Sequence, residues 1–289
     1  MKVFLLVFAA CCLPGLLACR AGGDPTAVLI AAGDIASCAS DGDEATAELL
    51  DGLDGTIAAL GDSVYASGSA GEFAECYDPT WGRHKSRTRP STGNHEYLTE
   101  GGEGYFEYYG KAAGDPAKGY YSYNLGTWHV IVINSACTRT NGCDATEQER
   151  WLRADLDDHA NACTLAYWHH PRFSSGLNGS NAYMDPYWQA LYEHRADVVL
   201  NGHDHDYERF APQDPSGRAD AERGIREFVV GTGGGSQIPF VSPAANSEVR
   251  DDETYGVLKL TLYPASYDWE FIPVAGSTFT DSGTGTCVE

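Results

Sequence analysis

Short apolar runs alternate with helix-type patterns along most of this chain, and this alternation restricts its fold more than any other feature. A short apolar run bounded by turn residues is typical of a buried strand, whereas apolar residues three and four apart indicate a helix. Alternating strands and helices predict an α/β architecture. The expected strands are residues 27–32, 56–60, 128–134, 164–168 and 198–201, and the expected helices are residues 44–51, 147–159 and 186–195.

Two of these helices carry start signals. Thr146 and Glu149 have the spacing of a capping box at the beginning of the helix at 147–159. Asp185, which is followed by a proline, is expected to be the N-cap of the helix at 186–195.

The pattern changes from Arg226 onward, where strand-type runs with glycine-rich turns replace the helices. We expect these runs, at 227–231, 256–263 and 267–272, to form a second sheet packed on the first within one domain that spans residues 27–289. The chain has 289 residues and is 43% hydrophobic, which is enough apolar material for a large core. The predicted fold class is therefore α/β (α+β), with two packed sheets.

The charge balance limits the partners of the chain. Nineteen Lys and Arg residues face 41 Asp and Glu residues, so the formal net charge is −22. Nucleic acids and anionic membranes both require positive charge on the protein, so we expect no nucleic-acid-binding surface. An acidic protein can still act on a phosphate ester if bound metal reverses the local field.

The N-terminus has the pattern of an export signal at residues 1–18, with Lys2 ahead of a broken apolar stretch that is too short to span a bilayer. The segment Leu16-Leu17-Ala18-Cys19 also has the pattern of a lipobox, in which Cys19 carries a lipid anchor. An ordinary secretory signal is the alternative. We expect an exported protein, secreted or anchored at the cell envelope, that contacts a membrane only through such a lipid, with a linker at 19–26.

The cysteine count agrees with export. Of nine cysteines, Cys11, Cys12 and Cys19 lie in or next to the signal, which leaves an even number suited to an oxidising compartment. Six cysteines allow 15 connectivities, and the sequence cannot select one. The pairs we expect are Cys137 with Cys143 across a short loop, Cys38 with Cys76 and, by elimination, Cys163 with Cys287.

Polar motifs follow the predicted strands, and one more follows a short element at 90–92. In open α/β sheets ligands bind at the carboxyl ends of the strands, so we expect these motifs to share one site. The motifs are Gly33-Asp34, Gly61-Asp62-Ser63-Val64-Tyr65, Gly93-Asn94-His95-Glu96, His169-His170-Pro171 and Gly202-His203-Asp204-His205.

The side chains of these motifs are a donor set of carboxylates, an amide oxygen and imidazoles, which suits zinc, iron or manganese. One carboxylate can bridge two ions about 3.5 to 4 Å apart. Each motif alone has an ordinary structural explanation, because Gly-Asp is a common turn and a lone histidine is often a packed core residue. Their order and spacing together favour a metal site.

This series of motifs resembles the calcineurin-like metallophosphoesterases and is most similar to their purple acid phosphatase branch. The resemblance extends over residues 27–209. It implies a single-domain sandwich of two mixed sheets flanked by helices. It also implies two metal ions per chain, iron plus a divalent ion that is zinc, manganese or iron.

The resemblance implies a role for each motif residue. Asp34, Asp62, Tyr65 and His205 would hold one ion. The second ion would be held by Asp62, Asn94, His169 and His203, with Asp62 bridging the two. His95 would act as a catalytic acid, and Glu96, which has no ligand role, would support the ligands or lie at the surface.

The implied activity is hydrolysis of phosphate esters by in-line attack of a metal-bound hydroxide, most simply on monoesters. A phosphodiesterase or nucleotidase on the same site is the alternative, and a lipid-anchored phosphate- or metal-binding protein without turnover is the rival from another class. The paired substrate-binding histidines of the plant enzymes are replaced here by Asn178 and Gly179. We therefore expect His170 and Arg172 to contact the substrate.

Overall fold

The computed structural model describes residues 24–137, 143–159 and 163–288. The predicted export signal and Cys19 lie outside the described residues. Within the described part of the chain, no helix is both long and apolar enough to cross a membrane.

The first sheet has six strands in the order β15-β14-β13-β1-β3-β5. Strands β1, β3 and β5 run parallel to one another, and β13 pairs antiparallel with β1. The sheet is therefore mixed, and its parallel half carries the first three motifs. The bounds are β1 Ala27–Ala32, β3 Thr56–Leu60, β5 Thr88–Ser91, β13 Gly256–Tyr263, β14 Ser266–Pro273 and β15 Ser282–Thr286.

The second sheet has seven strands in the order β12-β10-β11-β9-β8-β7-β6. Its centre is parallel, from β11 through β9 and β8 to β7, and antiparallel strands complete both edges. The bounds are β6 Tyr121–Leu125, β7 Trp128–Val132, β8 Thr164–Tyr167, β9 Val198–Asn201, β10 Tyr207–Phe210, β11 Arg226–Val230 and β12 Ser247–Asp251. A two-stranded ribbon pairs β2 (Ala36–Ser37) with β4 (Val64–Tyr65).

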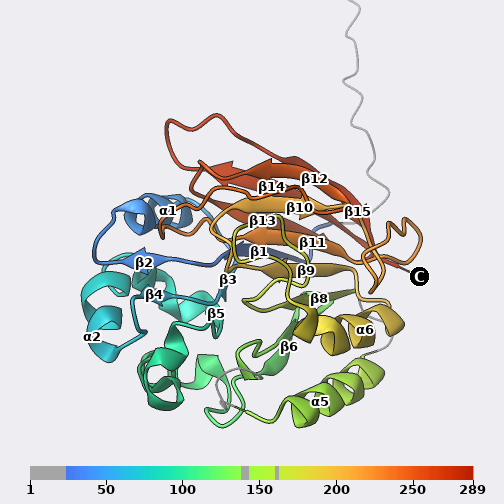
Figure 1. Ribbon diagram of the computed structural model, residues 1–289, viewed down its shortest axis with the longest axis horizontal. Coiled ribbons are helices and arrows are strands. Elements are labelled where there is room, and N and C mark those ends of the chain that lie inside the picture. The colour runs from blue at the N-terminus through green and yellow to red at the C-terminus, as the bar shows by residue number, and fades with distance from the viewer. Residues whose placement is uncertain (1–23, 138–142, 160–162, 289) are drawn as a thin grey trace, which may run out of the picture.

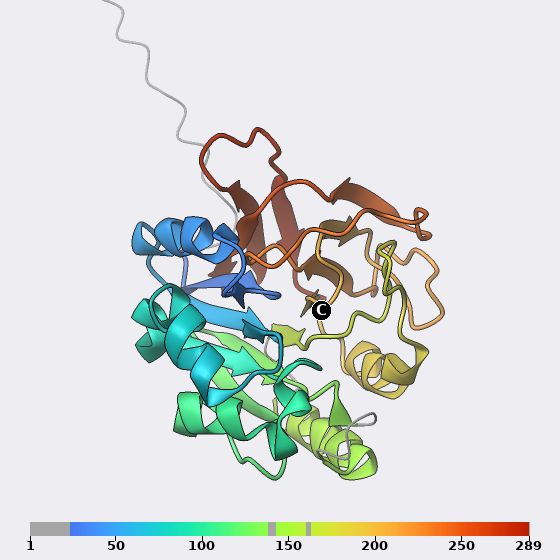
Figure 2. The same cartoon turned by 60° about the vertical axis from the view of Figure 1, so that its left-hand side comes forward.

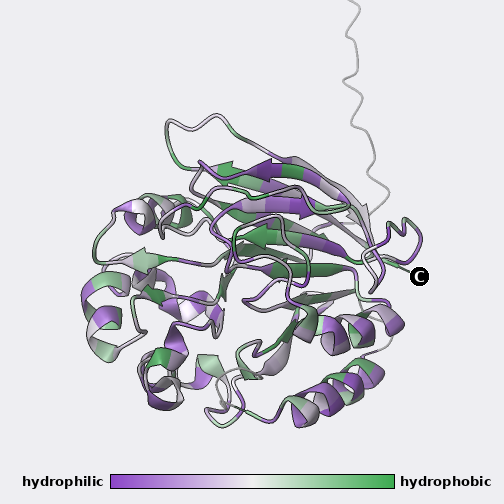
Figure 3. Cartoon of the chain, viewed as in Figure 1, coloured by the Kyte–Doolittle hydropathy of each residue, from purple (hydrophilic) through white to green (hydrophobic). Residues whose placement is uncertain are grey.

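Helices flank the two sheets on both sides, as Figures 1 and 2 show, with α1 and α2 on one side and α5 and α6 on the other. The main core lies between the sheets, where Val130 and Leu200 of the second sheet belong to the same buried cluster as Leu29 of the first. A second buried cluster joins α5 and α6 to the outer face of the second sheet, with Leu152 and Trp188 as members. Figure 3 shows the hydrophobic residues concentrated on the central strands. The predicted sandwich of two mixed sheets is confirmed.

The remaining elements are helical. Short 3-10 or π-helical turns lie between the larger elements, at Phe73–Tyr77, Trp81–Arg87, Glu96–Leu98, Glu100–Gly102, Gly110–Ala113 and Ala182–Met184. The α-helices are α1 Gly42–Asp51, α2 Ala70–Glu72, α3 Glu103–Tyr109, α5 Ala145–Asp158 and α6 Asp185–Glu193.

Both predicted helix caps were wrong by a small shift. The N-cap of α5 is Asp144, whose carboxylate accepts hydrogen bonds from the backbone N–H groups of Thr146 and Glu147. An aspartate accepts two such bonds at once, so it replaces the expected Thr146 cap. In α6, Asp185 is already helical and Met184 occupies the cap position.

The expected division between an N-terminal and a C-terminal sheet was also wrong. Strand β11 joins the second sheet beside β9, whereas β13, β14 and β15 extend the first sheet from β1. Each sheet therefore combines early and late strands. The β13–β1 pairing gives β1 a hydrogen-bonded neighbour on each side, which its fully apolar sequence requires.

Three disulfides join the same pairs that the sequence led us to expect. They link Cys38 to Cys76, Cys137 to Cys143 and Cys163 to Cys287, with Cα atoms 5.1, 4.8 and 5.7 Å apart. The last pair connects the beginning of β8 to the C-terminal end of the described chain.

Candidate metal centre

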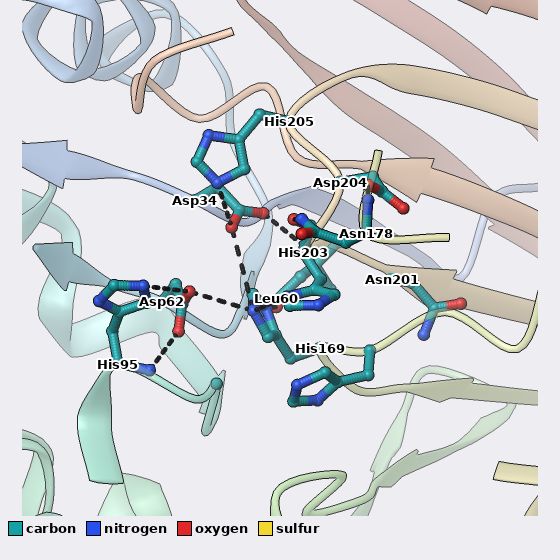
Figure 4. A network of polar contacts seen from close by, with 12 residues as sticks. Asp34, Leu60, Asp62, His95, His169, Asn178, Asn201, His203, Asp204 and His205 are labelled. Atoms are coloured by element: carbon teal, nitrogen blue, oxygen red, sulfur yellow. Dashed lines mark hydrogen bonds and ion pairs between the residues drawn. The ribbon is translucent and has the colours of Figure 1, made fainter. Parts of the chain in front are cut away.

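The five motifs meet at the carboxyl ends of strands from both sheets (Figure 4). The backbone N–H of His203, after β9, donates to Asp34 Oδ2, after β1, at 2.8 Å. His169 Nδ1, after β8, lies 2.9 Å from the carbonyl oxygen of Leu60 at the end of β3. The two sheets are thus joined at this edge by the motif residues themselves.

Three of these residues have strained backbone. Asp34, Asp62 and His203 adopt positive φ values of 59°, 46° and 75°. Non-glycine residues rarely occupy this region, because the side chain crowds the following carbonyl group. Such strain persists where the surrounding structure imposes it, and it occurs frequently at functional sites.

The first group of donor atoms comprises Asp34, Tyr65 and His205. Tyr65 Oη lies 2.7 Å from Asp34 Oδ1 and 3.0 Å from His205 Nε2. The third side of this triangle, from His205 Nε2 to Asp34 Oδ1, is 3.3 Å. Three donor atoms at such separations are arranged to surround one small cation.

The second group comprises Asp62, His169 and His203. His169 Nε2 lies 3.2 Å from Asp62 Oδ2 and 3.2 Å from His203 Nδ1. It is also 4.0 Å from Asp34 Oδ1, so the two groups are adjacent. Asp34, Asp62 and His169 together form one of the groups of described residues whose donor atoms could hold a metal ion.

Backbone carbonyl groups fix the tautomers of two of these histidines. Because a carbonyl oxygen only accepts, the contacts of His169 Nδ1 with Leu60 O and of His205 Nδ1 with Ser236 O place a proton on each Nδ1. Nε2 is therefore the nitrogen that faces the carboxylates, and once it has lost its proton its lone pair is free for a cation. Metal-binding histidines are commonly oriented in this way.

The buried carboxylates of the site change the pKa values of the neighbouring histidines. Burial alone would lower the pKa of His169, but the carboxylates of Asp62 and Asp34 raise it to about 10. Against the effect of burial, Asp34 raises the pKa of His205 to about 9. Burial, followed by the charge of His169, lowers the pKa of His203 to about 3. A cation that binds at the Nε2 atoms therefore displaces protons.

Asn94 supplies the test of whether a cation fits. Its Oδ1 atom is buried and accepts no hydrogen bond from the residues that the structure describes. A buried polar atom without a partner is costly, and coordination to a cation would remove that cost. Together with the two groups of carboxylate, phenol and imidazole donors, this amide oxygen fits a metal centre.

His95 lies at the rim of the site. Its Nδ1 atom contacts the carbonyl oxygen of Ala66, so this nitrogen carries a proton. Its Nε2 atom lies 3.9 Å from Asp62 Oδ2, and the side chain is 30% exposed. The ring therefore turns its second nitrogen toward the Asp62 carboxylate and remains accessible to a ligand from solvent.

Glu96 is fully buried, so of the two positions that the sequence left open for it, the surface position was wrong and the supporting one agrees with the structure. Its carboxylate accepts hydrogen bonds from the backbone N–H groups of Asp62, Ser63 and Gly93, at 3.1, 2.7 and 2.6 Å. Glu96 thereby connects the loop after β3 to the loop after β5. The only sequence signal for this role was its position directly after Asn94-His95.

The glycine run 231–235 packs directly against Asp34. A side chain at Gly231 would overlap the Asp204 carbonyl and approach Asp34 Oδ2, so only glycine fits there. Gly235 donates its N–H to the Asp34 carbonyl at 2.7 Å. This glycine run thereby supports the backbone of Asp34.

Asp204 was not selected from the sequence as a site residue. It lies between His203 and His205, and its carboxylate accepts hydrogen bonds from Ser174 Oγ and from the Asn178 backbone N–H. The Asn178 side chain in turn donates to the His203 carbonyl at 2.7 Å. These contacts attach the loop at 173–183 to the two histidines.

The two residues that we expected to contact the substrate, His170 and Arg172, lie in different surroundings. His170 is buried and lines a cavity next to Asn94 and His203. Arg172 is not among the residues that line this cavity, and its guanidinium group pairs with Asp185 instead. The expectation that Arg172 faces the substrate is therefore not supported by its position.

No family model matches the chain. Purple acid phosphatase 15 of Arabidopsis thaliana is 28% identical over 157 residues, which cover 47% of this chain and 29% of that protein. Among solved structures, a purple acid phosphatase from yellow lupin superposes with a TM-score of 0.70 at 17% identity, over 92% of this chain and 55% of that one.

Two further solved structures share the architecture. GAP50, described as an anchor in the inner membrane complex of Plasmodium, superposes with a TM-score of 0.71 at 13% identity. The match covers 92% of this chain and 90% of the GAP50 chain. PhoD has a TM-score of 0.59 at 12% identity, over 92% of this chain and 70% of that one.

The chain has the fold of the calcineurin-like metallophosphoesterases. This confirms the resemblance seen in the motifs, and the sequence likeness is to the purple acid phosphatase branch. The chain spans 29% of the Arabidopsis protein and 55% of the lupin protein, so those proteins contain further sequence. The same fold also occurs in an anchor protein, and fold alone does not fix activity.

Proposed function

We propose that this metallophosphoesterase-fold protein hydrolyses phosphate monoesters with two bound metal ions. The observation that carries the proposal is the pair of adjacent donor groups centred on Asp34 and Asp62. The similarity of part of the chain in sequence to a purple acid phosphatase supports the same function.

The described residues would hold the ions in two sets. Asp34, Tyr65 and His205 would bind iron, and Asn94, His169 and His203 would bind a divalent ion, with Asp62 shared. When bound, the two ions would supply charge stabilisation for the phosphate oxygens and a nucleophile at neutral pH. Asp62 Oδ1 accepts the His95 backbone N–H at 2.9 Å, which leaves Oδ2 directed at the donor cluster.

His95 would donate a proton to the leaving oxygen. Its Nδ1 is held by the Ala66 carbonyl, so the transferable proton belongs on Nε2, the nitrogen nearer to Asp62. A single general acid contributes about 10²- to 10⁴-fold to turnover. Because a protein that only binds phosphate needs no leaving-group acid, an accessible His95 favours catalysis over simple binding.

Export is part of the proposal. Three disulfides agree with an oxidising compartment, where such bonds persist. Lipidation at Cys19 would anchor the protein at the cell envelope, and detection of a diacylated N-terminal Cys19 by mass spectrometry of membrane-extracted protein would test it.

The proposed function is tested by metal analysis together with hydrolysis of nitrophenyl phosphate and bis-nitrophenyl phosphate. We expect two metal equivalents per chain and faster hydrolysis of the monoester. Asp62→Ala should lose both ions and the activity, whereas Asp158→Ala, at an exposed position of α5, should lose neither. Faster hydrolysis of the diester would contradict the monoesterase assignment, and two bound ions without turnover would contradict catalysis.

A further inference from the structure

A cavity of about 460 Å³ opens beside the candidate metal ligands Asn94 and His203. This volume is in the range of small-molecule sites. A phosphate held by the metal centre would therefore lie next to this cavity. The other described side chains that line it are Tyr97, Leu98, Ala136, His170, Asn178 and Asn181.

The lining of this cavity includes one large apolar side chain that is open to solvent. Leu98 is 66% exposed, although it lies only three residues after His95. In the described part of the chain, just two other large hydrophobic side chains are comparably exposed, Leu177 and Val241. Leu177 directly precedes the lining residue Asn178. An exposed apolar side chain in the lining of a cavity gives a ligand an apolar surface to pack against.

The cavity also lacks fixed charge among the residues that the structure describes. Its lining consists of amides, a phenol, imidazoles and apolar side chains, with no Asp, Glu, Lys or Arg. This is unusual on a chain with a net charge of −22. Beyond the proposed ions at Asn94 and His203, a leaving group that carries its own charge would lose water here without gaining a charged side chain as a partner.

We propose that this cavity holds the leaving group, and that the preferred substrates are monoesters whose leaving group is uncharged and has an apolar face. The inference rests on the proposed hydrolysis of phosphate monoesters. The apolar face would pack against Leu98 and the ring of Tyr97, while the amide groups would contact its polar parts.

The test compares three alkyl phosphates, because simple alcohols leave with similar difficulty: ethyl, 2-phenylethyl and 2-carboxyethyl phosphate. We expect the highest kcat/KM for 2-phenylethyl phosphate and the lowest for 2-carboxyethyl phosphate. Leu98→Ser should lower kcat/KM for the phenylethyl ester by roughly three- to tenfold, since apolar contact area is lost. The same variant should have a much smaller effect on ethyl phosphate, whose leaving group offers less apolar area to that contact.

Val241→Ser is the matched control. Val241 is 65% exposed, almost the same as Leu98, and it does not line the cavity. We expect this variant to hydrolyse all three esters like the unchanged protein. Equal effects of Leu98→Ser on ethyl and phenylethyl phosphate, or a preference for the carboxyethyl ester, would overturn the inference. Failure to hydrolyse any ester, with both ions bound, would overturn the proposed function instead.

Discussion

The carboxylate of Glu96 accepts a hydrogen bond of 3.1 Å from the backbone N–H of Asp62, the residue that we propose as the shared metal ligand. The same carboxylate also accepts the N–H groups of Ser63 and Gly93. Because Asp62 has a strained positive φ, these bonds help to hold its backbone in place. Glu96 is thus a positioning residue that does not contact the ligands' donor atoms.

Glu96→Ala should destabilise the fold and weaken metal binding. The substitution leaves three buried N–H groups without an acceptor, and each such group costs about 1 to 3 kcal/mol. We expect a loss of roughly 3 to 5 kcal/mol in the free energy of unfolding, measured by denaturant unfolding, and a lower metal content in the folded fraction. Glu100→Ala, at an exposed position nearby, is the control. Equal stability of the two variants would refute the role of Glu96.

Several central strands could be predicted because a short apolar run in the local sequence indicates a buried strand. β1, β3, β9 and β13 have the predicted bounds, and each combines an apolar run with adjacent glycine or turn residues. The edge strands could not be found in this way. β15 has the sequence Ser-Gly-Thr-Gly-Thr and is a strand only because β14 pairs with it.

The sequence predicted the motif residues of the site, but it did not predict the contacts that hold these residues in place. The structure brings all seven proposed metal ligands to one end of the sheets, because glycine-linked polar residues at strand ends are a local signal. The burial of Glu96 was not predictable, since glutamate is rarely buried. The contact between Asp204 and Asn178 was equally hidden, because it joins residues 26 positions apart.

Tyr65 provides a spectroscopic test of the iron assignment. Burial, followed by the charge of Asp34, raises the pKa of Tyr65 well above its usual value, so without a cation the phenol stays protonated and donates to Asp34. Binding of ferric iron would convert it to a phenolate with a visible charge-transfer band. We expect a violet protein when iron is loaded and loss of the band in Tyr65→Phe. A band of equal intensity in Tyr65→Phe would show that this phenol is not a ligand.

Asp197 gives the fold a pH dependence that is separate from the metal centre. It is almost fully buried and accepts the backbone N–H groups of Thr164 and Val288. Burial raises its pKa from 3.8 to about 7 despite these bonds. Between these two values the unfolded chain loses the proton while the folded protein keeps it, so the free energy of unfolding falls as the pH rises. Above about pH 7 Asp197 is ionised in the folded protein as well, and the full cost of burying its charge is subtracted from the free energy of unfolding.

Asp197→Asn should remove this dependence. We expect its free energy of unfolding, relative to the unchanged protein, to increase by roughly 2 to 4 kcal/mol between pH 4 and pH 8. Denaturant unfolding of both proteins across this pH range measures the difference. The contributions of the other titrating groups cancel in it, because both proteins contain them. A constant difference at all pH values would mean that folding does not raise the pKa of Asp197.

The role of His95 can be separated from metal binding by the choice of ester. If its imidazolium protonates the leaving oxygen, His95→Ala should lose about 10²- to 10⁴-fold in turnover of an alkyl phosphate. The loss should be much smaller for nitrophenyl phosphate, because nitrophenolate departs without a proton. His194→Ala, at the end of α6 and away from the site, should change neither rate.

The competing explanation is that His95 only supports the loop that carries Asn94. The ring contacts the Ala66 carbonyl, and its backbone N–H donates to Asp62, so such a role is physically reasonable. It predicts that His95→Ala loses metal and that both esters slow down together. Metal content and both rates, measured on one preparation, therefore distinguish the two: full metal occupancy with a selective loss for the alkyl ester requires a proton donor at this position.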